Sequence, residues 1–256
     1  MNVFLTGASS GIGAALAREF SRRGACLGLV ARRADLLAAL AAELATPCHI
    51  YALDVTDRAA LLGAARDFEA RCGGTDIVIA NAGISTGVQT EHADDLAVFE
   101  QVLATNLNAV VTTFHPFIAP MRARRSGTLA GIASVAGIRG LPGSEAYCPS
   151  KAALINYCES LRVGLRGSGI RVVTIAPGFI RTPMTAANPY PMPFLMDAQS
   201  FAAQAAVAIV RGDSFRVIPW QMAWVARLLR LLPDWAFDRA LAGRPRKPRA
   251  AAAGDG

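Results

Sequence analysis

The chain has 256 residues, hydrophobic residues at 53% of its positions and a net charge of +7. This length suffices for one α/β domain with a full core. The five cysteines are odd in number and show no C-x-x-C spacing, which argues against a disulfide framework and a zinc site and favours a reducing compartment. Much of the positive charge lies in residues 244–256, so the rest of the chain gives little reason to expect nucleic acid.

The sequence predicts one domain without a targeting or membrane-spanning segment. Strand-like residues begin at Asn2, so no signal peptide is expected. No window reaches the ~18 uninterrupted apolar residues of a spanning helix. We expect a cytoplasmic location, with peripheral contact at the inner membrane surface left open. The domain is predicted over residues 1–243, and a disordered basic tail over residues 244–256.

The first predicted elements are a strand at 3–5, a glycine-rich turn and a helix from residue 14. In that order, glycines let the backbone approach a pyrophosphate and leave the helix N-terminus facing the anion. The G-x-x-x-G-x-G spacing differs from the common G-x-G-x-x-G pattern, and an ordinary glycine-rich turn is the alternative. The residues expected at the phosphates are Gly7, Ser9, Ser10, Gly11, Ile12 and Gly13.

The second predicted strand, at 25–30, is followed by Arg32 and Arg33. In dinucleotide-binding folds this strand end faces the adenosine ribose, where an acid accepts from a 2′-hydroxyl and an arginine suits a 2′-phosphate. No acid stands here, because Asp35 already belongs to the next helix. Arg32, with Arg33 and Ser9, therefore favours NADP(H), although NAD(H) stays possible. The alternative for either arginine is a solvated helix start.

Strands and helices continue to alternate along the chain. Helices are predicted at 34–45, 57–71, 94–121 and near 200–211, and a further helix carries Lys151 and ends at about residue 166. Strands are predicted at 49–53, 77–80, 127–133, 170–176 and 215–218. This order predicts a Rossmann-type α/β fold, a doubly wound, mainly parallel seven-stranded sheet with helices on both faces. Polar and small residues at strand ends should line the ligand crevice. The alternative for each residue taken alone is that it is there because such residues favour turns. These residues are Asp54, Val55, Asn81, Ala82 and Gly83.

Tyr147 and Lys151 are four residues apart on a predicted helix, so the ammonium can lie beside the phenol and favour the phenolate. Ser134, at a predicted strand end, is placed to hydrogen-bond the oxygen that Tyr147 protonates. A helix-surface pair is the alternative. Lysine is scarce, however, with only Lys151 and Lys247 in the chain, and Lys247 falls in the expected tail. Asn106, amid apolar neighbours, is either a satisfied core residue or part of this site.

Jointly these motifs resemble the short-chain dehydrogenase/reductase family, which comprises single-domain NAD(P)-dependent oxidoreductases. The resemblance covers about residues 2–184. In family order, the matches are Thr6-Gly-x-x-x-Gly-x-Gly13, Asp54, Asn81-Ala-Gly83, Asn106, Ser134, Tyr147-x-x-x-Lys151, Pro177-Gly178 and Thr182. The chain departs from the family at Ala80, often an asparagine, and at Cys148-Pro149, where small residues are usual; little effect is expected.

The resemblance implies a role for each matching residue. Tyr147 is the acid/base, and Lys151 lowers its pKa while holding the nicotinamide ribose. Ser134 orients the substrate oxygen, and Asn106 positions a water in a proton relay. Thr182 meets the nicotinamide carboxamide. Further cofactor contacts are expected at Pro177, Gly178 and Ile180.

Two C-terminal segments lie outside the family motifs. Residues 184–201 occupy the position of the substrate lid and hold Met184, Met192, Met196 and Tyr190, which indicate either an apolar substrate or a proline-rich loop packed on the core. Residues 220–241 are predicted to form an apolar helical segment. Its wide apolar face should pack over the pocket or a partner subunit, or dip into a membrane surface with the basic tail assisting.

The leading hypothesis is an NADP(H)-dependent oxidoreductase that interconverts a carbonyl and an alcohol on a hydrophobic small molecule. The resemblance to this family implies a homodimer or a homotetramer. The alternative is a catalytically silent dinucleotide-binding regulator or membrane-associated scaffold. The intact set of Asn106, Ser134, Tyr147 and Lys151 argues against it, because a binding protein does not need all four.

Overall fold

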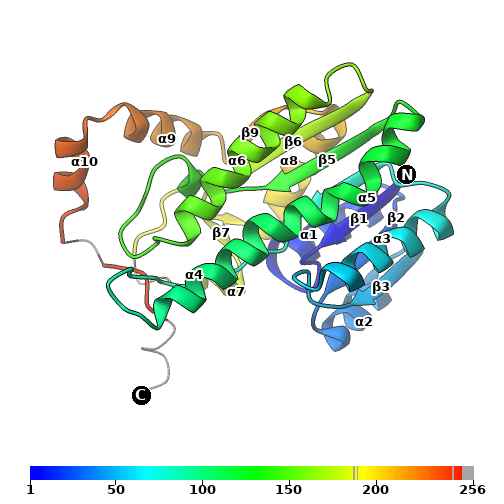
Figure 1. Cartoon of the computed structure of the whole chain (residues 1–256), viewed down its shortest axis with the longest axis horizontal. Coiled ribbons are helices and arrows are strands. Elements are labelled where there is room, and N and C mark those ends of the chain that lie inside the picture. Colours follow the sequence, from blue (N-terminus) through cyan, green and yellow to red (C-terminus); the bar gives the residue numbers. More distant parts are fainter. Residues whose placement is uncertain (187, 189, 244, 250–256) are drawn as a thin grey trace.

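The structure is a computed structural model that describes residues 1–186, 188, 190–243 and 245–249. Its centre is a seven-stranded parallel sheet of order β3-β2-β1-β4-β5-β6-β9, covered by helices on both faces (Figure 1). The predicted Rossmann-type fold is therefore confirmed. The strands are β1 (Asn2–Thr6), β2 (Cys26–Ala31), β3 (Cys48–Ala52), β4 (Ile77–Ala80), β5 (Gly127–Ile132), β6 (Ile170–Pro177) and β9 (Phe215–Ile218).

Two hydrophobic cores join the helices to the two faces of the sheet. On one face the core includes α1 (Gly11–Arg22), α2 (Ala34–Glu43) and α8 (Ala198–Arg211). On the other it includes α3 (Arg58–Cys72), α5 (Ala109–Ala123) and α6 (Tyr147–Gly164). Because both faces are covered, a central strand such as β4 is buried along its whole length. Polar side chains are therefore found at the ends of the strands, and the crevice lies at these ends.

The long helix predicted at 94–121 consists of three segments. They are α4 (Asp95–Leu103), a π-helical turn (Ala104–Asn108) and α5. By length and composition alone, the continuous run Asp95–Ala123 is apolar enough to cross a membrane. Its apolar character has a simpler cause, because Phe114, Phe117 and Met121 are fully buried in the second core. The π-helical turn interrupts the α-helical hydrogen-bond pattern at Asn106, and such turns are frequent at functional sites.

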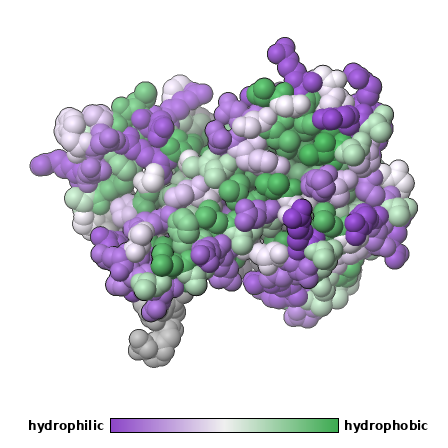
Figure 2. Space-filling view, in the orientation of Figure 1, coloured by the Kyte–Doolittle hydropathy of each residue, from purple (hydrophilic) through white to green (hydrophobic). Residues whose placement is uncertain are grey.

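The segment predicted at 220–241 forms two helices, α9 (Gln221–Leu231) and α10 (Asp234–Leu241). Both extend from the main body of the molecule (Figure 1). Met222 and Ala226 on α9 are buried, whereas the large apolar side chains that point outward are at least 62% exposed. They are Trp220, Trp224, Leu228, Leu231 and Trp235. The wide apolar face is therefore not covered by the described part of the chain, and hydrophobic residues interrupt the hydrophilic surface in this region (Figure 2).

The disordered tail predicted at 244–256 stays a prediction, and the structure shows contacts of its residues 245–249 with the rest of the chain. These residues lie at one end of the molecule, where they contact the loop that follows β4 and the start of α4 (Figure 1). Two contacts hold this segment: Arg249 pairs with the buried Asp95, and the backbone of Pro248 accepts a hydrogen bond from Gly87. The other residues of the predicted tail, 244 and 250–256, lie outside the described residues.

Candidate active site

The carboxyl ends of the central strands border a cleft of about 290 Å³. Every residue predicted to bind the cofactor lines this cleft, as do Ser134, Tyr147 and Lys151. The residues from the first half of the sheet are Gly7, Ser9, Ser10, Gly11, Ile12, Gly13, Arg32, Arg33, Asp54, Val55, Asn81, Ala82 and Gly83. Those from the segment after β6 are Pro177, Gly178, Ile180 and Thr182. The order of the strands thus assembles the expected set in one place.

The glycine turn between β1 and α1 is close-packed. A Cβ at Gly13 would lie 2.0 Å from the carbonyl oxygen of Gly7, and Gly7 itself has φ +68°. Asn81 holds the turn from β4, because its amide donates to the carbonyls of Thr6 and Gly7 at 3.1 and 3.2 Å. Ser10 at the N-cap makes no side-chain cap, so the N-terminus of α1 stays open to the cleft. This cradle fits a pyrophosphate.

Arg32 and Arg33 follow β2 and line the cleft in different arrangements. Arg33 donates to the hydroxyls of Ser9 and Ser10 at 3.0 and 2.8 Å. Arg32 lies 3.7 Å from the carboxylate of Asp54. Burial acts to raise the pKa of Asp54, but hydrogen bonds from Thr56 and the charge of Arg32 lower it overall. Two guanidinium groups therefore border the cleft at the end of β2, with one carboxylate facing Arg32.

Tyr147, Lys151 and Ser134 meet at the other end of the cleft. Tyr147 begins α6, and its ring centroid lies 5.8 Å from the Nζ of Lys151. The Lys151 ammonium donates to the carbonyl of Ile132 at 2.9 Å, which ties α6 to the end of β5. Ser134 follows β5, and its Oγ accepts from the backbone of Ala136.

The pKa of Tyr147 shifts in the direction opposite to the expected one. Burial raises it to about 12, and the neighbouring Ser134 hydroxyl opposes the rise. Burial also lowers the pKa of Lys151 to about 8. The phenol is therefore protonated at neutral pH, which is the state required of a proton donor. The lysine remains mainly an ammonium at pH 7.

Asn106 is fully buried and lies behind the cleft rather than on its wall. Its amide donates to the carbonyl of Ile84 and to the Oγ of Ser150, both at 3.0 Å, and its Oδ1 accepts from Ile84 at 2.9 Å. The amide thus joins the loop after β4 to α6. A Cβ at Gly83 would lie 3.2 Å from Asn106 Oδ1 and 3.5 Å from Lys151 Nζ. Gly83 is therefore close to both Asn106 and Lys151 and leaves little room for a side chain between them.

The segment after β6 closes the cleft with short elements. β7 (Ile180–Arg181) pairs with β8 (Met196–Asp197), and α7 (Pro183–Ala186) starts the loop between them. Thr182 approaches the glycine turn, since a Cβ at Gly11 would lie 3.1 Å from its methyl group. Met184 lines the cleft, and Tyr190 is near enough to raise the pKa of Tyr147. Two positions of the predicted lid, 187 and 189, lie outside the described residues.

Sequence reasoning missed one residue beside the phenol. The Nζ of Lys247 lies 5.6 Å from the Tyr147 ring centroid and donates to Ser85 Oγ. Only the scarcity of lysine could have drawn attention to it. A separate hollow of about 780 Å³ lies nearby, between the loop before α6 and α10, but neither Tyr147 nor Lys151 lines it.

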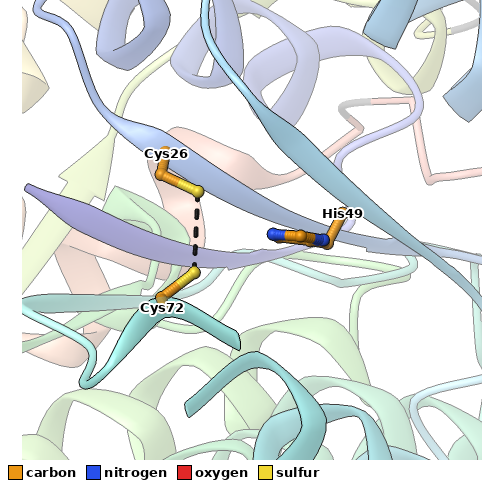
Figure 3. Close-up of side chains that lie close together, drawn as sticks. All are labelled: Cys26, His49 and Cys72. Atoms are coloured by element: carbon orange, nitrogen blue, oxygen red, sulfur yellow. Dashed lines mark hydrogen bonds between the residues drawn. The ribbon is translucent and has the colours of Figure 1, made fainter. Parts of the chain in front are cut away.

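A second cluster lies at the opposite edge of the sheet. Cys26 of β2, His49 of β3 and Cys72 of α3 place their ligand atoms within 4.8 Å of one another, and the two sulfurs are 3.5 Å apart (Figure 3). Burial raises the pKa of Cys72 to about 12, which disfavours the thiolate that binds metals. The absence of a metal site stays a prediction. No sequence motif predicts this cluster, because its three residues come from three separate elements.

Comparisons with known proteins agree with this geometry. The family model described as short chain dehydrogenase matches residues 1–191. A protein of Myxococcus xanthus (strain DK1622), described as an uncharacterized oxidoreductase, is 40% identical over 239 residues, covering 92% of this chain and 94% of that protein. A cis-4-hydroxycyclohexanecarboxylate dehydrogenase of Sinomonas cyclohexanicum is 34% identical over 72% of this chain and 75% of its own length. A solved serine dehydrogenase complexed with NADP+ is 25% identical with a TM-score of 0.76, covering 85% of this chain and 94% of its own.

Proposed function

The chain belongs to the short-chain dehydrogenase family of oxidoreductases, and from this premise we propose that it interconverts a carbonyl and an alcohol with NADP(H). The bound cofactor supplies or accepts the hydride. Tyr147 gives its proton to the carbonyl oxygen in reduction, or takes a proton from the alcohol in oxidation. The substrate is a small molecule with a hydrophobic part, which Met184 and Tyr190 of the lid would contact.

The convergence of Ser134, Tyr147 and Lys151 at one end of the cleft carries this proposal. The Ser134 hydroxyl would hold the substrate oxygen, and the Lys151 ammonium would hold the nicotinamide ribose. Asn106 would fix the backbone behind Lys151, and its role in positioning a water remains an expectation. Burial favours the neutral phenol, so the proton to be donated is present at neutral pH.

Substitution of Tyr147 tests the assignment. Tyr147→Phe should lower kcat for carbonyl reduction by about 10²-fold or more, because it removes the proton donor. Tyr157→Phe is a matched control, since this second tyrosine of α6 packs against Phe114 and does not line the cleft. NADPH oxidation with a panel of ketones is the measurement. Near-normal activity of Tyr147→Phe would refute the role of the phenol.

The preference for NADP(H) is supported by the two arginines that border the ribose end of the cleft. Arg33, held by Ser9 and Ser10, and Arg32 would both face a 2′-phosphate. Titration of NADPH and NADH by fluorescence should show tighter binding of NADPH. Arg33→Ala should weaken NADPH binding more than NADH binding, and equal affinities of the unmodified protein would contradict the preference.

Assembly and location form the last part of the proposal. We expect a cytoplasmic homodimer or homotetramer. The exposed apolar face of α9 and α10 specifically favours a second possibility, a membrane-associated protein whose basic residues assist binding to anionic lipids. Flotation of the full-length protein with anionic vesicles tests that version. Failure to float would remove it and leave a partner subunit as the cover of this face.

A further inference from the structure

Residues 245–249 form a strap that the chain holds in place beside Tyr147. Pro248 accepts from the backbone of Gly87 at 3.0 Å, and Arg249 forms two bonds to the carboxylate of Asp95 at 2.8 and 3.1 Å. Asp95 is 1% exposed, so this ion pair has a buried partner. Arg246 donates to Gln89 at 2.8 Å. The strap therefore has an anchor on each side of Lys247.

The surface beneath the strap is shaped to receive it. A Cβ at Gly87 would lie 2.3 Å from the carbonyl oxygen of Lys247, and one at Gly143 would lie 2.9 Å from its backbone nitrogen. Gly87 belongs to the loop after β4 and Gly143 to the loop before α6. Gly87 follows Ser85 by two residues and Gly143 precedes Tyr147 by four, so the strap lies against both loops beside the phenol.

The side chain of Lys247 points toward the ring of Tyr147. Its ammonium lies 5.6 Å from the centroid of the Tyr147 ring and donates to Ser85 Oγ. It is partly buried, and within the described part of the chain no carboxylate pairs with it. The two lysines of the whole chain thus both flank one phenol, in a protein where 24 of the 26 cationic side chains are arginines.

We propose that Lys247 is a substrate-binding residue that takes a carboxylate, so the substrate is an oxo or hydroxy acid with an apolar body. This inference rests on the proposed function and names its substrate class. A partly buried ammonium with only a neutral partner gains most from an anion, because a charge-assisted hydrogen bond repays its desolvation. Lys247 does not line the cofactor cleft but lies beside Tyr147, which favours the substrate over the dinucleotide as the source of this anion.

Ligand binding tests the proposal without relying on turnover. The full-length protein saturated with NADP+ is titrated calorimetrically with octanoate and, separately, with octanamide, which has the same body and no charge. The unmodified protein should bind octanoate about ten- to a hundredfold more tightly than the amide. Lys247→Met should abolish this preference and Lys247→Arg should retain part of it. Arg166→Met is the matched control, because it removes an exposed cation beyond the end of α6 opposite to Tyr147, and it should leave the preference intact.

Three results would overturn the proposal. The first is that the unmodified protein shows no preference for octanoate over octanamide. The second is that Lys247→Met keeps this preference. The third is that Lys247→Met binds octanoate more tightly than the unmodified protein, which would show that the strap obstructs the site. Tyr147→Phe separates this inference from the proposed reaction. If that variant keeps both the octanoate preference and its activity, the reaction assignment fails while the carboxylate site stands.

Discussion

The glycine turn between β1 and α1 and the C-terminal strap both bring residues to the candidate site, but different interactions hold them. The turn is fixed by backbone packing within one βα unit and by Asn81 of a neighbouring strand. The strap is fixed by side chains and backbone groups more than 150 residues earlier in the sequence. The first arrangement follows from the fold itself. The second depends on a few contacts that a single substitution can remove without disturbing the sheet.

The largest effect is expected in the turn. Gly13→Ala should lower the free energy of unfolding by about 3 kcal/mol, because its Cβ has no space beside Gly7. Gly63→Ala in α3 is the control, since a Cβ there meets nothing within 4 Å and should stabilise the helix by up to ~1 kcal/mol. Urea denaturation measures both variants. Equal stability of the two would show that the turn relaxes to accept the methyl group.

Lys151→Met should separate function from stability. Turnover should fall by about 10²-fold or more and NADPH binding should weaken, while the protein becomes more stable. Because burial lowers the pKa of Lys151 from 10.5 to about 8, its ammonium destabilises the fold at pH 7 by about 3 kcal/mol at most. This penalty is complete below pH 8 and disappears as the pH rises toward 10.5. A variant less stable than the parent at pH 7 would contradict the sign.

The pH dependence should differ between the two reaction directions. Oxidation of an alcohol requires the phenolate of Tyr147, whose pKa burial raises to about 12, so its rate should climb by up to about tenfold from pH 7 to pH 8, where the Lys151 ammonium begins to lose its proton. Reduction uses the neutral phenol and should vary far less over this range. Initial rates at saturating substrate measure both. A steeper dependence for reduction would show that another group donates the proton.

The smallest effect is expected at the anchor of the strap. Arg249→Lys keeps a cation beside the buried Asp95 but loses the paired hydrogen bonds of the guanidinium, so octanoate affinity should fall only roughly two- to fivefold. Binding of NADPH should not change. Calorimetry of both ligands is the measurement. A loss as large as that of Lys247→Met would mean that this anchor alone holds the strap.

The sheet and the cleft could be predicted because their signals are local. The strands are short apolar runs, and parallel strands place the residues that follow them at one edge. The π-helical turn at Asn106 could not be predicted, because residues 104–108 contain no helix-breaking residue. The pKa of Tyr147 was expected to fall beside Lys151, but the burial that opposes this effect appears only in three dimensions.

The strap could not be predicted for a related reason. Residues 245–249 have the arginine, lysine and proline content of a solvated tail, and no periodicity links them to the loops at Gly87 and Gly143. Their contacts depend on matching surfaces that are far apart in the sequence. The two exposed helices before the strap were likewise recognised as apolar, but their lack of cover within the described chain is a property of the fold.

The scarcity of lysine also has a chemical consequence. Apart from the α-amino group of Met1, reagents that acylate primary amines find only Lys151 and Lys247 in this chain. Lys151 is 4% exposed, whereas Lys247 is more accessible, so a fluorescent succinimidyl ester should attach beside the phenol without any engineered cysteine. A dye on Lys247 would therefore report on the surroundings of Tyr147 in the otherwise unmodified protein.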